Sequence, residues 1–187
     1  LTNGSSEDKK LSVFSYVEWC LWNADDDMKN FQRNLSTGEV EVQDSTIYHK
    51  TEYRERRNHY AIYSVNTKID GFDTSRDAFL GAYRGADSPE AVENGKCTNS
   101  MASGWSPIAS HQINVDLAAG ETKTFIFVLG YIENPEDEKW ESYGVINKTR
   151  AKEMLAKYQT DAQVDEAFAA LQAYWKQLLA RYTGRFR

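Results

Sequence analysis

Apolar positions predict β-strands over most of the chain before residue 134. Residues 11–22 carry apolar side chains on both faces of an extended strand, which is typical of a strand lying between two layers. Residues 38–42 alternate valine with glutamate and predict a half-exposed strand, and residues 59–66 predict another strand. The glycine-rich stretch 71–95 predicts loops, with Ala78-Phe79-Leu80 as a small apolar anchor.

A β-hairpin is predicted for residues 112–117 and 122–129, because two apolar runs flank the four residues 118–121. The second run contains Phe125-Ile126-Phe127-Val128-Leu129, which is continuously apolar. Such a run is typical of a strand that is buried on both faces. It therefore predicts a central strand of the sheet.

The pattern becomes helical in the last part of the chain. Asn134-Pro135-Glu136 predicts a helix start with proline at the first helical position, and Thr160-Asp161-Ala162-Gln163 matches a capping box. Apolar residues then recur at steps of three and four, which predicts an amphipathic helix of about 22 residues and roughly 33 Å. The apolar stripe of this helix, which requires a surface to pack against, consists of Val164, Phe168, Leu171, Trp175, Leu178 and Tyr182.

These patterns together predict a mainly β protein, with a β-sandwich over residues 1–133 and a helical segment over residues 134–187. The chain starts at Leu1 rather than at methionine, and it ends directly after the predicted helix. We therefore expect a piece of a longer polypeptide.

Composition narrows the classes of partner. The formal net charge of the 187 residues is −6, which disfavours a nucleic-acid backbone as the main partner. No run of 18 apolar residues is present, so no membrane span is expected, and no signal peptide is visible. Cys20 and Cys97 are too few for a disulfide framework, and Cys20 lies in an apolar run typical of a buried thiol. A cytoplasmic protein is expected.

Candidate binding chemistry is concentrated between two predicted strands, in Asn30-Phe31-Gln32-Arg33-Asn34. The amide of Gln32 offers two donors and an acceptor, and the guanidinium of Arg33 offers five donors in a fixed fork. Such groups match the neutral hydroxyls of a sugar ring. Ordinary loop polarity explains the same residue types, and on residue type alone it is the favoured interpretation.

Carboxylates on the predicted strands offer little catalysis. Glu39 and Glu41 have Cα atoms about 6.6–6.8 Å apart on a strand, which lies in the range for an inverting glycosidase pair. Their side chains share one face, however, so a solvated strand face is favoured over a site that encloses a glycosidic bond. Glu18 is a carboxylate in an apolar strand and requires either a partner or a polar cleft.

Other motifs are incomplete. His49, His59 and His111 have no ligand at helical spacing, so no zinc signature is present and no metal is expected. The sequence has no glycine-rich phosphate loop of the GxxxxGK[ST] form. The motif that begins at Gly104 has Pro107 and Ile108 where a nucleophile elbow requires a donor and a glycine. The residues themselves thus identify no catalytic acid, base or nucleophile.

Several ordered motifs resemble the cellobiose phosphorylases of the inverting disaccharide phosphorylase family, glycoside hydrolase family 94. They are Phe14-Ser15-Tyr16-Val17-Glu18-Trp19-Cys20-Leu21-Trp22-Asn23, the stretch 30–41, the stretch 48–60, Gly71-Phe72-Asp73-Thr74 and the stretch 103–111. The resemblance extends from about Leu1 to about Tyr182. It implies the latter part of a galactose-mutarotase-like β-supersandwich, followed by a helical linker to an (α/α)6 barrel that lies outside this chain.

The resemblance also implies a reaction. Inorganic phosphate, the co-substrate, attacks the anomeric carbon of cellobiose with inversion and yields glucose 1-phosphate and glucose, while an aspartic acid of the barrel protonates the leaving oxygen. This chain would carry none of the catalytic residues and no cofactor. Gln32 and Arg33 would contact the acceptor glucose, and the full enzyme would be a homodimer.

Two alternatives remain open at this point, a self-contained carbohydrate-binding sandwich and a purely structural dimer domain. The identity of the acceptor, whether glucose, gluconate or a longer glucan, also remains open.

Overall fold

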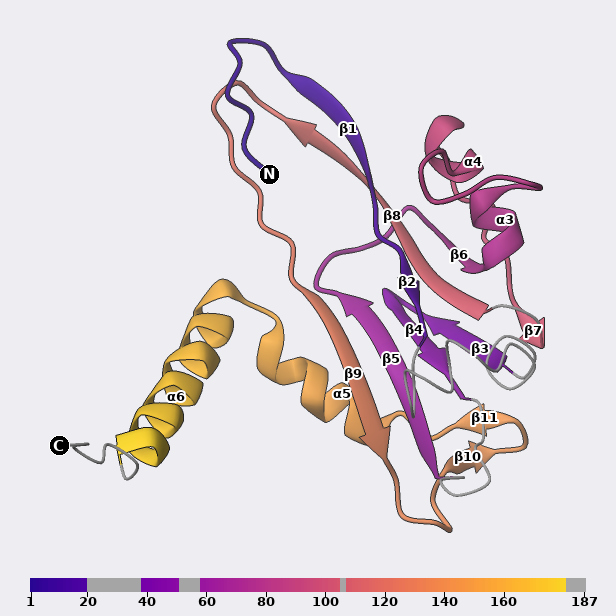
Figure 1. Ribbon diagram of the computed structural model, residues 1–187, viewed down its shortest axis with the longest axis vertical. Coiled ribbons are helices and arrows are strands. Elements are labelled where there is room, and N and C mark those ends of the chain that lie inside the picture. The colour runs from indigo at the N-terminus through magenta and orange to yellow at the C-terminus, as the bar shows by residue number, and fades with distance from the viewer. Residues whose placement is uncertain (20–37, 51–57, 105–106, 181–187) are drawn as a thin grey trace, which may run out of the picture.

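The computed structural model describes residues 1–19, 38–50, 58–104 and 107–180, and it is a mainly β fold of two facing sheets (Figure 1). In the first sheet, β8 pairs with three strands, β1, β2 and β6. These four strands are β1 (Lys9–Phe14), β2 (Val17–Glu18), β6 (Gly71–Ser75) and β8 (Pro107–Leu117). The second sheet has the order β7-β3-β4-β5-β9, and its strands are β7 (Ser103–Gly104), β3 (Gly38–Gln43), β4 (Thr46–His49), β5 (His59–Val65) and β9 (Phe127–Glu133).

Two apolar clusters hold the sheets together. Tyr63 of β5 packs with Ala109 of β8, and Val65 packs with Ile113 and Leu117. Each fully buried aliphatic side chain of this kind contributes about 1.5–3 kcal/mol. The predicted β-sandwich is therefore confirmed.

A third cluster covers the outer face of the second sheet. Tyr60 and Ile62 of β5 pack there against Ile146 and against the helix α5 (Thr149–Leu155). Gly130 permits the close approach, since a Cβ atom at this position would lie 2.5 Å from Met154 Cε. The first helix of the C-terminal segment is thus part of the sandwich.

The outer face of the first sheet carries the fourth cluster, which includes α3 (Arg76–Leu80) and α4 (Glu90–Glu93). Phe79 is buried there and stacks on Tyr16, with ring centroids 5.1 Å apart. The predicted apolar anchor in the glycine-rich stretch is therefore confirmed, and part of this stretch is helical rather than loop.

The predicted hairpin of residues 112–117 and 122–129 is wrong, because β8 and β9 belong to different sheets. The turn itself exists, with Glu121 N donating to Ala118 O at 3.0 Å. The N-terminal residues then take the place of the second arm. Asn3 N donates to Glu121 O at 2.9 Å and Thr2 bridges to Thr122. The chain then crosses to the other sheet, where β9 is an edge strand among the described residues and not the predicted central one.

The helix predicted to begin at Pro135 is also wrong. A short hairpin of β10 (Trp140–Ser142) and β11 (Val145–Ile146) follows instead, with Gly144 at φ 70° in its turn. Asn134 does not cap a helix; it is buried, and its side-chain amide donates to Asn147 O at 3.1 Å. Tertiary hydrogen bonds of this kind override the local signal.

The C-terminal helix is confirmed. After the short 3-10 helix η1 (Ala156–Tyr158), α6 (Asp161–Ala180) begins at the predicted capping box, where Gln163 N donates to Thr160 Oγ1 at 3.3 Å. Its carboxamide accepts from Thr160 N in return, at 3.1 Å. None of the described residues of α6 is buried, and the helix extends away from the sandwich (Figure 1). None of the described helices is long and apolar enough to cross a bilayer.

Candidate functional site

The predicted sugar-contacting residues, Gln32 and Arg33, lie outside the described residues. The structure does place the strands that flank them in sequence. Glu18 of β2 pairs with Ile108, and Gly38 of β3 pairs with Gly104. β2 and β3 belong to different sheets, but they pair with residues that are only four positions apart in sequence, Ile108 and Gly104.

Glu18 has the partner that its apolar strand requires. Its Oε1 accepts from Tyr16 OH at 2.5 Å and from Arg76 Nε at 3.1 Å. The hydrogen bond from Tyr16 and then that from Arg76 hold the pKa of the Glu18 carboxyl below its usual range, although burial opposes them. Glu18 is thus a charged acceptor at the end of β2.

Glu41 of β3 is the centre of an ion cluster that we call the β3 cluster, consisting of Glu41, Lys50 and Lys148. Glu41 Oε2 lies 2.5 Å from Lys148 Nζ, while Oε1 lies 3.2 Å from Lys50 Nζ and accepts from the amide of Ile146 at 2.9 Å. Burial alone would raise the pKa of Glu41, but the hydrogen bonds from Lys148, Ile146 and Lys50 outweigh it and lower that pKa. The cluster fixes β3 to the segment before α5.

The solvated face predicted for Glu39 and Glu41 is therefore correct for Glu39 only. The side chain of Glu39 is 67% exposed, whereas that of Glu41 is 17% exposed. Both carboxylates lie within 4 Å of the same ammonium, that of Lys50. They act as counter-charges to lysine.

Beside the β3 cluster, Trp140 combines an aromatic face with cations. Lys139 Nζ lies 4.8 Å from its ring centroid and Lys50 Nζ lies 5.9 Å from it. Such cation–aromatic contacts contribute about 0.5–1 kcal/mol at exposed sites. The surface around Trp140 thus combines polar and aromatic groups. The charges of the adjacent β3 cluster are paired with one another, which indicates a structural role.

All three histidines are buried. Burial lowers the pKa of His49 to about 4 and that of His111 to about 4. His59 is also buried, with its ring 4.9 Å from that of Tyr131. No group of three potential metal ligands occurs in the part of the chain that the structure describes.

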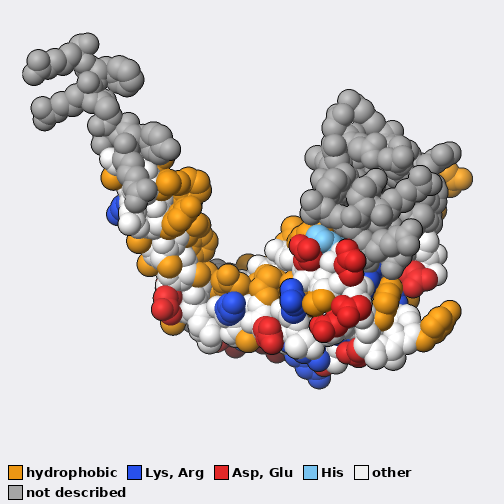
Figure 2. All heavy atoms as spheres, turned by 90° about the horizontal axis from the view of Figure 1, so that it is seen from below, with side chains coloured by type: hydrophobic (Ala, Val, Ile, Leu, Met, Phe, Trp, Pro, Cys, Tyr) orange, Lys and Arg blue, Asp and Glu red, His pale blue; other side chains and the backbone are white. Residues whose placement is uncertain are grey.

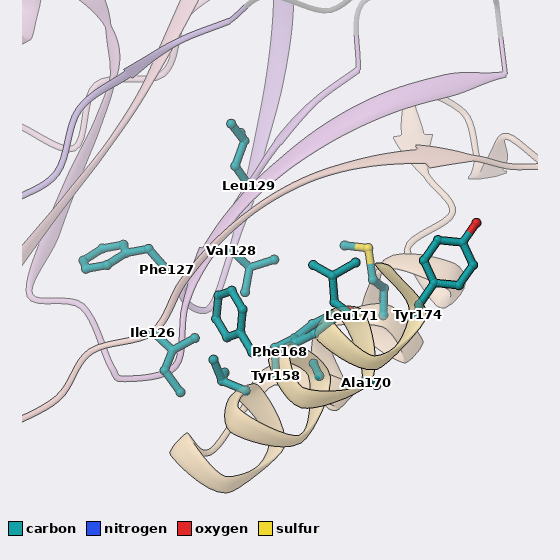
Figure 3. Close-up of a pocket in the computed structure, with 12 residues that line it drawn as sticks. Ile126, Phe127, Val128, Leu129, Tyr158, Phe168, Ala170, Leu171 and Tyr174 are labelled. Carbon is teal, nitrogen blue, oxygen red and sulfur yellow. The ribbon is translucent and has the colours of Figure 1, made fainter. Parts of the chain in front are cut away.

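A groove of about 730 Å³ lies between β9 and α6 (Figure 3). Val128 lines it on the strand side, and Phe168, Leu171 and Tyr174 line it on the helix side. Apolar side chains are visible along α6 in the space-filling view (Figure 2). Phe168 belongs to the predicted apolar stripe of α6 and is still 68% exposed. The strand side of the groove therefore buries this stripe only in part.

Residues 1–161 match the family described as "Glycosyl hydrolase 94, supersandwich domain". The match includes both sheets, the β10–β11 hairpin and α5, and it ends at the first residue of α6.

Three curated relatives extend the comparison. The chain is 28% identical over 187 residues to an N,N′-diacetylchitobiose phosphorylase of Vibrio furnissii, and 28% identical over 183 residues to one of Vibrio proteolyticus. It is 25% identical over 180 residues to a solabiose phosphorylase of Paenibacillus borealis. These alignments cover 99%, 97% and 92% of this chain but 21% of each relative. The chain thus spans about a fifth of the length of these relatives.

Proposed function

This chain belongs to the glycosyl hydrolase 94 supersandwich family, and we propose that it is the β-sandwich domain of an inverting disaccharide phosphorylase. The observation that carries the proposal is the family match over residues 1–161, which spans the complete set of described strands. Three relatives are disaccharide phosphorylases by name, which supports the same reaction class.

The reaction that we propose for the whole enzyme is phosphorolysis. A phosphate oxygen forms a bond to the anomeric carbon while the glycosidic C–O bond breaks, and a general acid protonates the leaving oxygen. We assign the general acid to polypeptide outside this chain, because the resemblance implies an aspartic acid of the barrel in this role. No cofactor is required, because phosphate itself is the nucleophile.

Within that enzyme the role of this chain is to position the acceptor side of the pocket. In sequence, Gln32 and Arg33 come between β2 and β3, and these strands pair with Ile108 and Gly104. A segment held at both ends by strands of a packed sandwich is suited to present donors to sugar hydroxyls. The further proposal is a cytoplasmic homodimer, which rests on the resemblance alone.

Cellobiose is the substrate that we propose, on the basis of the sequence motifs. The relatives carry the names of other disaccharides, N,N′-diacetylchitobiose and solabiose, at 25–28% identity. The experiment is therefore a panel. The full-length protein that contains this chain is incubated with phosphate and with each of the three disaccharides, and sugar 1-phosphate is followed by phosphorus NMR.

We expect α-glucose 1-phosphate from cellobiose, because inversion at a β-linked carbon gives the α-phosphate. Sugar phosphate from another disaccharide alone would retain the reaction class and overturn the substrate. Sugar release that does not depend on phosphate would overturn the reaction class. The isolated chain of 187 residues is expected to release no sugar phosphate in the same assay.

A further inference from the structure

The outer edge of β9 has unpaired backbone groups. Asn66 N donates to Ile126 O at 3.1 Å, and Asn134 N donates to Asn58 O at 3.2 Å. Since the groups of an antiparallel strand point alternately to either side, the amides of Val128, Gly130 and Ile132 face β5. Those of Phe127, Leu129 and Tyr131 face away from β5, where no described strand pairs with them.

The side chains of Phe127, Leu129 and Tyr131, whose amides face away from β5, are partly exposed to solvent. Phe127 is 37% exposed, Leu129 is 62% exposed and Tyr131 is 42% exposed. They stand on the face of β9 that looks toward the first sheet, because Tyr131 contacts His59 and Phe127 stacks on Tyr63, 5.9 Å away. The interior of the sandwich is therefore open beside β9.

A cavity of about 290 Å³ lies at this opening. Residues of β2 and its C-terminal end line one side, and Leu129, Gly130 and Tyr131 line the other. Trp19 belongs to the lining, and its buried Nε1 atom has no hydrogen-bond partner. Because buried polar atoms are normally hydrogen-bonded, an occupant with a hydrogen-bond acceptor for Trp19 Nε1 suits this space.

Two other edge strands, β1 and β7, are protected against pairing, and β9 is not. The outer strand β1 begins with the exposed pair Lys9 and Lys10, and β7 has only two residues. Charged residues and short strands are the usual protection of an edge. In contrast, β9 has no charge and no proline from Phe127 to Ile132. Its composition is that of an interior strand.

We propose that a further β-strand, from a segment of the same polypeptide outside this chain, pairs with the outer edge of β9 and covers Phe127, Leu129 and Tyr131. The partner strand carries apolar residues toward the interior and an oxygen acceptor for Trp19 Nε1. A backbone that hydrogen-bonds to a sheet edge supplies both affinity and alternating side-chain contacts. The inference rests on the proposed function only in that the chain is one domain of a longer protein.

A second copy of the chain is the competing occupant. The curated relatives are about five times as long as this chain, so ample polypeptide of one molecule is at hand. A tethered strand has an effective concentration on the order of millimolar. It therefore outcompetes a second molecule at the much lower concentrations of ordinary solutions.

Hydrogen exchange on the full-length protein tests the proposal, with an internal control in the same strand. The amides of Val128, Gly130 and Ile132 are protected by β5 in any case. If a strand pairs with the outer edge, the amides of Phe127, Leu129 and Tyr131 exchange within about tenfold of these neighbours, because both sets are then in sheet hydrogen bonds. Outward amides that exchange more than about 100-fold faster would overturn the proposal.

A dilution series separates the two occupants. Protection by a strand of the same polypeptide is unchanged when the protein is diluted from about 10 μM to about 0.1 μM, since an intramolecular contact does not depend on concentration. Protection that is lost on dilution would identify a second copy and overturn the choice of occupant. These readouts do not depend on phosphorolysis, so a failure of the proposed reaction leaves this test valid.

A pair of variants tests the side-chain contacts. Leu129→Lys introduces a charge into the proposed buried seam, and we expect the full-length protein to lose stability in urea unfolding. Leu11→Lys is the matched control, because Leu11 is 43% exposed on β1, whose edge already carries lysines. Equal urea midpoints for the two variants would overturn the burial of Leu129.

Discussion

Lys148 Nζ lies 2.5 Å from Glu41 Oε2, and this contact joins β3 to the start of α5 across more than one hundred residues of chain. Both side chains are largely buried, at 7% and 17% exposure. The pair is the electrostatic link between the second sheet and the helical segment, and it predicts two unequal losses of stability.

Lys148→Met is expected to cost about 1.5–3 kcal/mol of unfolding free energy, the value of one hydrogen bond to a charged group. Glu41 would keep Lys50 and the amide of Ile146 as partners. Glu41→Gln is expected to cost more, about 3–5 kcal/mol, because the buried Lys148 then loses its counter-charge. Urea unfolding of both variants measures the order.

The exposed pair of Arg84 and Glu93 is the matched control for the β3 cluster, since both side chains are at least 40% exposed. Ion pairs in water contribute little, so Glu93→Gln should leave the urea midpoint unchanged. A larger loss for Lys148→Met than for Glu41→Gln would contradict the assignment of Glu41 as the centre of the cluster.

Stability should fall with pH between about 6.5 and 4. Burial lowers the pKa of His49 and of His111 to about 4 in the folded chain, whereas an unfolded histidine has a pKa of about 6.5. In this window the unfolded chain binds protons that the folded chain excludes, so the contribution is complete above pH 6.5 and is lost as the pH falls. Each histidine contributes up to about 3 kcal/mol.

The variant His111→Phe tests this pH dependence, because the ring lies beside Tyr63, with centroids 4.9 Å apart, and phenylalanine keeps an aromatic ring there. Urea unfolding from pH 4 to pH 7.5 should give a shallower slope for the variant than for the wild type. The low pKa of Glu41 acts in the same direction, but at a pH below the usual value of about 4.5 for this group. An unchanged slope in His111→Phe would show that His111 is not kept neutral.

Asp73 should be indispensable for the loop that follows α4. Its carboxylate is fully buried and accepts from Thr98 Oγ1 at 2.6 Å, from Ser100 Oγ at 2.8 Å and from the amides of both residues. Asp73→Asn removes the charge and places a donor among donors, which should cost about 1.5–3 kcal/mol or more. Thermal unfolding measures the loss, and hydrogen exchange at Thr98 and Ser100 should accelerate. Wild-type exchange at both amides would refute this role.

Helix α6 should be the least stable element of the isolated chain. It has no buried residue in its described length, whereas all seven residues of β5 are buried. Because a helix gains most of its stability from packing, its amides should exchange close to the rate of a free helix. Hydrogen exchange compares α6 with β5 in a single sample. Equal protection of the two elements would contradict the prediction.

The sequence predicted best where local pattern and burial agree. β3, β5 and the capping box at Thr160 were all predicted, since each follows from periodicity or from hydrogen bonds within four residues. The failures lie where distant residues decide. Asn134 resembles a helix cap, yet its amide is used by Asn147, and the hairpin was wrong because Asn3 pairs with Glu121.

For the candidate site, the sequence predicted which type of interaction a residue needs but not which residue supplies it. The sequence showed that Glu18 needed a partner, but it could not identify Arg76, which is 58 positions away. The environment of Glu41 was predicted incorrectly, because Lys148 comes from another element and burial by that element is invisible in the local pattern. The periodicity of apolar residues carries no information about such long-range contacts.

Arg33 provides the most direct test of the proposed acceptor site. If its guanidinium donates to hydroxyls of the acceptor glucose, Arg33→Ala in the full-length protein removes a charged hydrogen bond of about 1.5–3 kcal/mol, or about 10- to 150-fold in kcat/KM. Arg33→Lys should not restore the loss, because an ammonium cannot reproduce the planar fork. Thermal stability should hardly change. The loss should differ between glucose and 6-deoxyglucose as acceptors in the synthetic direction, since the analogue lacks one hydroxyl. A solvated arginine instead predicts wild-type kinetics with every acceptor, and that result would remove Arg33 from the site.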